Sequence, residues 1–274
     1  MKGRIFSTLL LWSLIVATAS FFGAQGAVIL ATLAAALMQY ELYRMLSHSG
    51  KNPLVWPGIC VGVFVSLTPL LGKVPLVGGT GLVIPAILLF SVAALLRKPR
   101  GNVTDALGST LLGLLLGPCT LLFISLAIFQ FGPAKEGLFM ALWIVMVTKF
   151  TDMGALLVGL AFGRHKLAPA ISPKKTWEGV FGGIAICMIS SAVYVHFAAP
   201  VLPTGFTPLL SVALSLPLAV ASVFADLLES SFKRECGVKD SGGLLPGIGG
   251  VFDLTDSFML SAPLAYYLTV LTLA

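Results

Sequence analysis

GVFGGIAICMISSAVYVHFAAPVLPTGFTPLLSVALSLPLAVASVFA (residues 179–225) decides the class of fold. This stretch contains no Asp, Glu, Lys or Arg in 47 residues. A helix of about 20 apolar residues crosses a hydrocarbon core about 30 Å thick. The stretch is therefore long enough for two membrane crossings, with a break at the proline-containing segment 199–208.

The composition of the whole chain agrees with a membrane protein. Of the 274 residues, 57% are hydrophobic and only 10% are charged, and the mean hydropathy is +1.00. An ordinary soluble domain carries about 25% charged residues, so this chain cannot cover a water-facing surface. The composition excludes a soluble globular enzyme, a disordered regulator and a nucleic-acid-binding module. The apolar stretches are continuous rather than alternating, which disfavours a β-barrel, and we expect an all-α, polytopic integral membrane helix bundle.

Other charge-poor segments bring the expected number of transmembrane helices to about nine. The first, residues 5–40, is long enough for two crossings hinged at residues 23–26, although its start also resembles a signal peptide. The others are residues 52–72, 74–96, 106–134, 137–163 and 257–274. We find no internal repeat, so the sequence does not support an inverted-repeat transporter.

The distribution of basic residues predicts the orientation. With the N-terminus in the cytoplasm, 14 of the 17 Lys and Arg residues fall on the cytoplasmic side. Cytoplasmic loops of membrane proteins carry such an excess. We therefore expect a cytoplasmic N-terminus and cytoplasmic loops over residues 164–178 and 229–256, in a cell membrane that we expect to be a bacterial inner membrane.

Acidic residues divide the chain into two regions. Eight of the 11 Asp and Glu residues lie between positions 152 and 256. We therefore expect a hydrophobic transmembrane scaffold over residues 1–142 and a transmembrane catalytic region over residues 143–274.

One predicted span carries two charges, Lys149 and Asp152. A charge at membrane depth costs a few kcal/mol or more, so it usually faces the bundle interior or water. The i, i+3 spacing places both side chains on one helix face. Either they form a structural ion pair, or Asp152 lines a polar cavity near a substrate or metal.

The loop at 164–178 combines four Lys or Arg residues with Ser172 and Thr176, directly before a predicted helix. Cations, hydroxyls and a helix N-terminus are suited to binding phosphate. The alternative is an ordinary cytoplasmic loop that contacts anionic lipid headgroups.

The densest polar segment begins with Asp226 and Glu229, at i, i+3 near the end of an apolar helix. Asp253 and Asp256 have the same spacing at the start of the next helix. Such carboxylates repel one another unless a divalent cation or a proton intervenes. Three cations lie between them, namely Lys233, Arg234 and Lys239. The pattern suggests Mg²⁺ carrying a polyphosphate; the alternative is a solvated loop with surface ion pairs.

These segments resemble the signature of the phosphatidate cytidylyltransferases, also called CDP-diacylglycerol synthases. The pattern reads roughly S-x-(apolar)-K-R-x₄-K-D, then P-x-H-G-G, then D-R-x-D. The matching residues are Ser230, Lys233, Arg234, Lys239, Asp240, Gly242, Leu245, Pro246, Gly249, Gly250, Asp253 and Asp256. Upstream blocks of the family match at Asp226, Glu229 and Ser230, at Ser172, Pro173, Lys175, Thr176, Trp177 and Gly179, and at Asp152 with Gly154.

Three positions depart from the family pattern. Ile248 replaces a His, Leu254 replaces an Arg, and Ala225 stands where Gly usually precedes the Asp. If that His or Arg serves the substrate phosphate, then activity or substrate choice changes.

The resemblance implies transfer of a cytidylyl group from CTP to phosphatidate, giving CDP-diacylglycerol and pyrophosphate. It implies Mg²⁺, with room for a second cation, held by Asp226, Asp253 and Asp256. The implied catalytic residues are Asp226, Lys233, Arg234, Lys239, Asp240, Asp253 and Asp256, of which Lys233, Arg234 and Lys239 would neutralise the phosphates. The implied substrate contacts are Asp152, Ser172, Lys175, Thr176, Glu229 and Ser230. The expected partners are CTP, phosphatidate and membrane lipids, with no nucleic acid, and a homodimer is an option. Two alternatives stay open: a cytidylyltransferase for another phosphorylated lipid, and a non-catalytic lipid-binding or transport relative.

Overall fold

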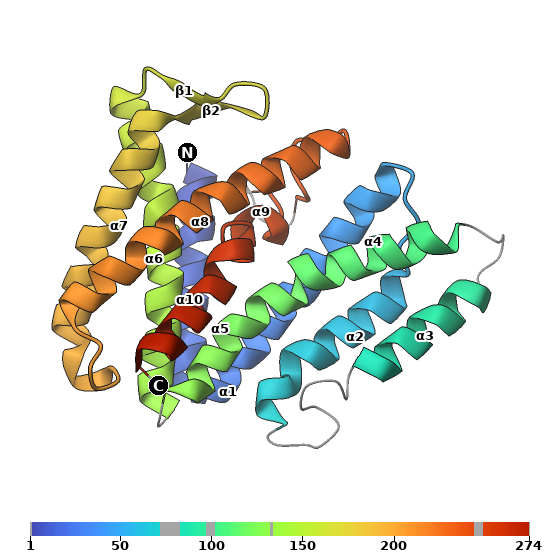
Figure 1. Ribbon diagram of the computed structural model, residues 1–274, viewed down its shortest axis with the longest axis horizontal. Coiled ribbons are helices and arrows are strands. Elements are labelled where there is room, and N and C mark those ends of the chain that lie inside the picture. The colour runs from blue at the N-terminus through green and yellow to red at the C-terminus, as the bar shows by residue number, and fades with distance from the viewer. Residues whose placement is uncertain (1, 72–82, 97–101, 132–133, 244–248, 274) are drawn as a thin grey trace. The chain divides into compact units, whose positions relative to one another are not determined.

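The computed structural model describes residues 2–71, 83–96, 102–131, 134–243 and 249–273 (Figure 1). The chain forms two compact units. The first comprises Met1–Ser125 and Glu235–Thr255, and the second comprises Leu126–Arg234 and Asp256–Ala274.

The first unit is helical. Its elements are α1 (Lys2–His48), α2 (Val55–Leu67), the 3₁₀ turn η1 (Thr68–Leu70), α3 (Val83–Leu96), α4 (Val103–Leu116), the start of α5 (Pro118–Gln130), and α9 (Val251–Thr255). Helix α1 runs through the expected hinge with a kink at Gly23, where φ is 58°. Glycine tolerates this left-handed conformation because it has no Cβ, so the chain bends there without a turn.

Buried hydrogen bonds join three helices of the first unit. The Gln39 amide nitrogen donates to the Tyr43 hydroxyl (2.8 Å) and to the carbonyl of Gly58 (2.9 Å). The Tyr43 hydroxyl donates to the carbonyl of Thr110 (2.8 Å). A methyl group on Gly58 or Gly113 would collide with the Tyr43 ring. Interhelical hydrogen bonds and small residues at contacts are how membrane helices pack without a hydrophobic driving force.

The second unit contains the rest of α5, α6 (Ala134–Phe162), β1 (Lys166–Ala168), β2 (Ser172–Thr176), α7 (Trp177–Ala198), the 3₁₀ turn η3 (Ala199–Val201), α8 (Pro208–Glu235) and α10 (Phe258–Leu273). Helices α6 and α7 lie side by side (Figure 1). A methyl group on Gly179 or Gly183 would meet backbone oxygens of α6, so the two backbones are in close contact. The Trp143 indole donates to the Ser191 hydroxyl (2.9 Å), which donates to the carbonyl of Ser211 in α8 (3.1 Å).

Five described helical segments are long and apolar enough to cross a membrane. They are Ser13–His48, Val103–Gln130, Lys135–Phe162, Trp177–Val201 and Pro208–Glu235. Their outward faces carry apolar side chains such as Leu160, Phe197 and Leu209, which are 77%, 78% and 81% exposed. The chain is therefore an all-α, multi-pass membrane protein. The figure of about nine crossings stays a prediction, since part of the predicted span 74–96 lies outside the described residues.

The loop at 164–178 contains structure that the sequence did not predict. Strands β1 and β2 form an antiparallel hairpin in which Lys166 pairs with Thr176 and Ala168 with Ser172. The hairpin connects the end of α6 to the start of α7 (Figure 1). The basic loop is thus a folded element rather than an irregular connection.

Candidate active site

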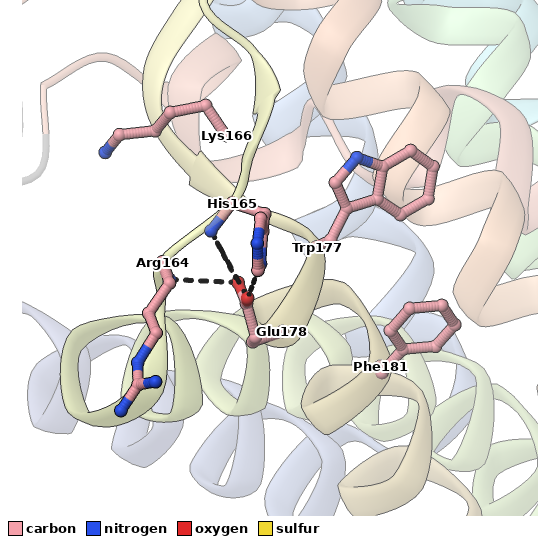
Figure 2. A pocket seen from close by; sticks show the side chains of 6 residues that line it. All are labelled: Arg164, His165, Lys166, Trp177, Glu178 and Phe181. Carbon is pink, nitrogen blue, oxygen red and sulfur yellow. Dashed lines mark hydrogen bonds and ion pairs between the residues drawn. The ribbon is translucent and has the colours of Figure 1, made fainter.

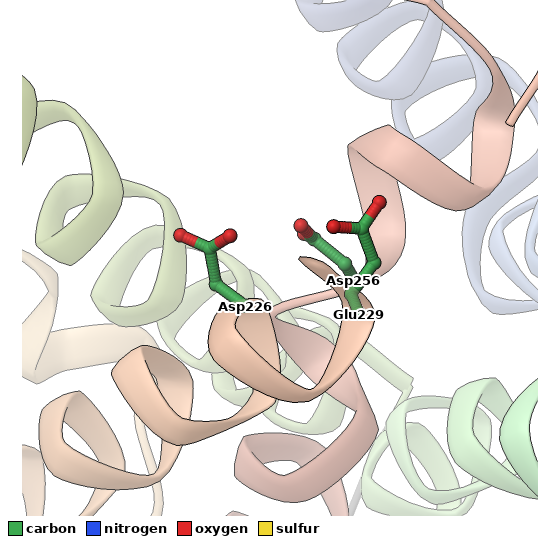
Figure 3. A group of neighbouring side chains, drawn as sticks. All are labelled: Asp226, Glu229 and Asp256. Atoms are coloured by element: carbon green, nitrogen blue, oxygen red, sulfur yellow. The ribbon is translucent and has the colours of Figure 1, made fainter. Parts of the chain in front are cut away.

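Three carboxylates gather in the second unit (Figure 3). Asp226 and Glu229 come from α8, and Asp256 comes from the turn that precedes α10. One oxygen from each carboxylate lies within 4.8 Å of the other two, and we call this group the acidic trio. Glu229 and Asp256 are only 1% and 7% exposed. Hard carboxylate oxygens at this spacing are the ligands that Mg²⁺ prefers, so the acidic trio fits a divalent cation.

Two lysines pair with the acidic trio. The Lys175 ammonium lies 2.7 Å from a carboxylate oxygen of Asp226, and Lys233 forms an i, i+4 ion pair with Glu229 along α8. The side chains of both lysines are less than one-fifth exposed. Strand β2 therefore places the ammonium group of Lys175 beside the carboxylates of α8.

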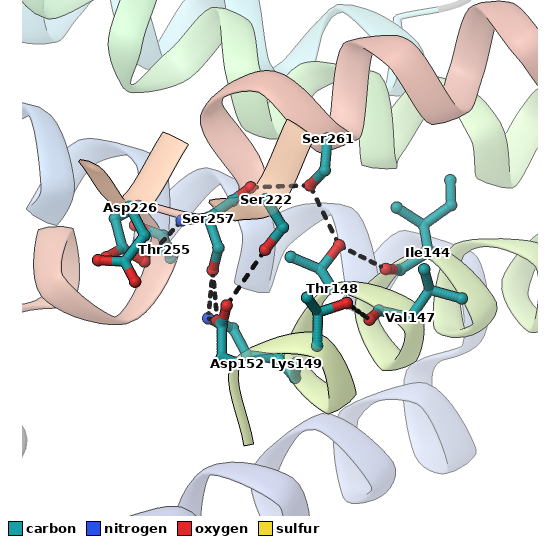
Figure 4. Close-up of polar contacts among 12 residues, drawn as sticks. Ile144, Val147, Thr148, Lys149, Asp152, Ser222, Asp226, Thr255, Ser257 and Ser261 are labelled. Carbon is teal, nitrogen blue, oxygen red and sulfur yellow. Dashed lines mark hydrogen bonds and ion pairs between the residues drawn. The ribbon is translucent and has the colours of Figure 1, made fainter. Parts of the chain in front are cut away.

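A second polar group surrounds Asp152 on α6 (Figure 4). The Lys149 ammonium donates to Asp152 (3.1 Å) and to the hydroxyl of Ser257 (2.8 Å). The Ser257 hydroxyl donates to the same Asp152 oxygen (2.8 Å), and Ser222 donates to the other (3.1 Å). The structure thus shows the ion pair between Lys149 and Asp152. Ser257 follows Asp256 and Ser222 lies one turn before Asp226, so this group adjoins the acidic trio.

The electrostatics of Asp256 reflect this crowding. Asp256 lies outside the five candidate spans. Burial raises the pKa of its carboxyl group well above the usual range; Lys149 lowers that pKa, whereas Asp226 and Asp152 raise it. A nearby cation inverts this balance by favouring the ionised form. The acidic trio is therefore a place where added positive charge stabilises the protein.

The hairpin is fixed to the start of α7 by Glu178 (Figure 2). The Glu178 carboxylate accepts hydrogen bonds from the backbone N–H groups of Arg164 (3.1 Å) and His165 (3.2 Å), and pairs with the His165 ring (2.5 Å). The Thr176 hydroxyl accepts from the N–H of Gly179 (3.2 Å), which caps α7. These contacts hold the strand that carries Lys175.

The start of the hairpin and the first turns of α7 form a pocket of about 660 Å³ (Figure 2). It is lined by Arg164, His165, Lys166, Trp177, Glu178 and Phe181. The rings of Trp177 and Phe181 stack with centroids 6.1 Å apart. Aromatic and basic side chains together are typical of a membrane–water interface. The hairpin therefore places Lys175 beside the acidic trio and Arg164 and Lys166 at this pocket. Both interpretations of the loop, phosphate binding and contact with lipid headgroups, stay predictions.

Asp253 belongs to the first unit, in the first turn of α9. Its carboxylate accepts hydrogen bonds from the N–H groups of Ser241 (3.1 and 3.2 Å) and Gly250 (2.8 Å). Gly249 has a φ of 119°, a conformation that side chains rarely adopt. A methyl group there would also meet the Asp253 carboxylate. Gly249 of the motif is thus required by the local backbone.

Comparison with known proteins then identifies the family. A model described as "Cytidylyltransferase family" matches residues 2–272. The chain belongs to the cytidylyltransferase family. This confirms the resemblance drawn from the motifs.

Several curated relatives are named phosphatidate cytidylyltransferase. The chain is 42% identical to the protein of Haemophilus influenzae over 137 residues, which cover 48% of this chain and 46% of that relative. It is 39% identical to the protein of Staphylococcus aureus (strain COL) over 142 residues, covering 52% and 53%. For Bacillus subtilis (strain 168) the identity is 36% over 186 residues, covering 68% and 66%. The chain spans about half the length of the first two relatives.

The remaining cytidylyltransferase motif residues lie in varied surroundings. Ser172 and Ser230 are half-buried, whereas Arg234, Lys239 and Asp240 are exposed. Of the three departures, Ala225 is fully buried in α8 and Leu254 is half-buried in α9. Ile248 lies outside the described residues. The roles predicted for these side chains stay predictions.

Several polar residues around the candidate site have no role predicted from the sequence. Helix spacing could have identified Ser222, because it lies four residues before Asp226. Ser257 could have been identified because it directly follows Asp256. For Glu41 the sequence offers only a weak indication, namely that this acid directly follows a 36-residue run without charge. Its hydrogen-bond partners in the first unit lie about 200 positions further along the chain.

Proposed function

We propose that this protein transfers the cytidylyl group of CTP to phosphatidate and releases pyrophosphate, producing CDP-diacylglycerol. The observation that carries the proposal is the acidic trio with Lys175 and Lys233 paired at its edge. Polyphosphate chemistry needs a hard cation and basic side chains in one place. The names of the curated relatives support phosphatidate as the acceptor.

In the proposed reaction, a phosphate oxygen of phosphatidate attacks the α-phosphorus of CTP. The new P–O bond forms as the bond from the α-phosphorus to the bridging oxygen of the β-phosphate breaks, and pyrophosphate leaves with that electron pair. No covalent intermediate with the protein is needed. A bound Mg²⁺ would supply charge neutralisation at the phosphoryl oxygens.

The protein's own side chains would prepare the site for this charge. Asp226, Glu229 and Asp256 would hold Mg²⁺, and a second cation remains part of the proposal. Lys175 and Lys233 already face these carboxylates. A cation on the acidic trio competes for the same oxygens, which makes the two ammonium groups available to phosphate oxygens. That Asp253 shares the metal stays a prediction from the sequence motif.

The proposal extends to the membrane arrangement. About nine crossings with a cytoplasmic N-terminus place the hairpin and the end of α8 on the cytoplasmic side, where CTP is found. Phosphatidate would enter from the leaflet, since its acyl chains remain in lipid. We also propose a homodimer, to be tested by mass measurement of the purified protein.

The test is incorporation of labelled CTP into lipid by the purified protein. The assay contains Mg²⁺ and either phosphatidate or another phosphorylated lipid, and Asp226→Asn is compared with Glu136→Gln, an acid in the first turn of α6. We expect labelled CDP-diacylglycerol from the unmodified protein and Glu136→Gln only. Turnover restricted to a different lipid phosphate would reassign the acceptor. No CTP turnover in folded protein with any lipid phosphate would overturn the proposal.

A further inference from the structure

Glu41 is a buried carboxylate in the mostly apolar helix α1. It lies in α1 of the first unit and is 7% exposed. Burial of a carboxylate is costly unless hydrogen bonds compensate. The structure supplies two such bonds, from the hydroxyl of Ser241 (3.0 Å) and from the N–H of Phe252 (2.9 Å).

Both donors flank the glycine-rich segment of the motif. Ser241 precedes its start, and Phe252 lies in the first turn of α9, just after its end. Gly242 and Gly250 also lie against the Glu41 carboxylate, where a methyl group on either would collide with it. Through these contacts, the Glu41 carboxylate therefore holds the two described ends of this segment close together.

The same backbone holds Asp253. Ser241 donates its hydroxyl to Glu41 and its N–H to Asp253. Gly250, which packs on Glu41, also donates its N–H to Asp253 (2.8 Å). Two residues in contact with Glu41 thus orient the Asp253 carboxylate.

We propose that Glu41 is a positioning residue, which holds Ser241 and the start of α9 so that the Asp253 carboxylate is kept in one orientation. This inference rests on the proposed function for its consequence in catalysis. Its structural part, the fastening of the segment by Glu41, can be tested without any turnover.

The first experiment measures hydrogen–deuterium exchange of the backbone amides in purified Glu41→Ala. The amides of Ser241, Gly250 and Phe252 should exchange about tenfold faster, the effect expected when a buried hydrogen bond to a charged group is lost. Glu41→Gln keeps an acceptor oxygen and should restore slow exchange. Thr32→Val is the matched control, because Thr32 is equally buried in α1 and its hydroxyl bonds only within the helix, to the carbonyl of Val28, among the described contacts.

The second experiment measures the Mg²⁺ concentration that gives half-maximal CTP turnover. It should rise about tenfold in Glu41→Ala, return toward the original value in Glu41→Gln, and leave the KM for phosphatidate unchanged. Ser241→Ala removes one of the two bonds and should show a smaller rise, which keeps the test available if Glu41→Ala fails to fold.

The outcomes separate the two proposals. Unchanged exchange at the three amides in Glu41→Ala, or a uniform increase across the whole first unit, would overturn the positioning role. An unchanged Mg²⁺ requirement together with faster exchange would overturn only the consequence for Mg²⁺, which rests on the metal role that the motif predicts for Asp253. Failure of the unmodified protein to turn over CTP would instead refute the proposed function, while the exchange data would still decide whether Glu41 fastens the segment.

Discussion

Replacing Lys175 by Met should separate the binding of the cation from the chemical step. Met keeps most of the side-chain length and removes the charge that lies 2.7 Å from Asp226. If Lys175 neutralises the triphosphate in the transition state, kcat/KM for CTP should fall about 100-fold, the usual loss for one preorganised charge-stabilising group. The assay is initial-rate turnover of CTP with phosphatidate.

The same substitution should act in the opposite direction on Mg²⁺. Lys175 and Mg²⁺ compete for the carboxylate of Asp226, so removing the ammonium favours the metal. The side chains of the pair are 19% and 33% exposed, and solvent screens such a pair to about 1 kcal/mol. The Mg²⁺ concentration for half-maximal activity should therefore fall about fivefold, even as the rate drops.

Lys174 provides the matched control for this experiment. It is the neighbouring lysine on β2 and its side chain is exposed, so Lys174→Met should change neither kinetic quantity by more than about twofold. Identical kinetics for the two variants, or a higher Mg²⁺ requirement in Lys175→Met, would refute the argument that Lys175 competes with the cation.

Three further predictions concern the cation, the orientation and a motif departure. Asp226→Asn and Asp256→Asn should each lower turnover at least 100-fold without loss of the folded protein, and excess chelator should abolish turnover until Mg²⁺ is restored; full activity in chelator would contradict the metal site. In a cysteine-free background, a cysteine at Lys174 should react with a membrane-impermeant reagent only from the cytoplasmic side, and one at Thr204 only from the opposite side. Leu254→Arg should raise turnover measurably if the missing family cation is uncompensated, and a loss of turnover in folded protein would show that Leu254 is needed as it stands.

The helices of this protein were predictable because each long helix corresponds to a continuous apolar run in the sequence. Long apolar runs gave the class of fold, and the hinge expected at residues 23–26 appears as the kink at Gly23. The hairpin was missed, because strands of three and five residues leave almost no periodic signal. The proline and lysines of β2 also obscured it, since these residues are rare in strands.

Helix spacing predicted the candidate site only where its parts are close in sequence, and the family motif added Asp256. Asp226 and Glu229 share a helix face, and the i, i+3 spacing identified them together. The pairing of Lys175 with Asp226 joins residues 51 positions apart, and nothing in either segment specifies the other. Glu41 is still further from its partners, so its role depends on the packing of α1 against α9.

The ion pair of Lys175 also decides at which step, folding or nucleotide binding, its side chain loses conformational entropy. Ordering a free lysine side chain costs up to about 2 kcal/mol. Because Asp226 already fixes the end of this side chain in the folded protein, that cost falls mostly on folding rather than on nucleotide binding. If the proposed function holds, an incoming triphosphate would exchange one anionic partner of Lys175 for another, and the affinity for CTP would be reduced far less than a flexible lysine would require.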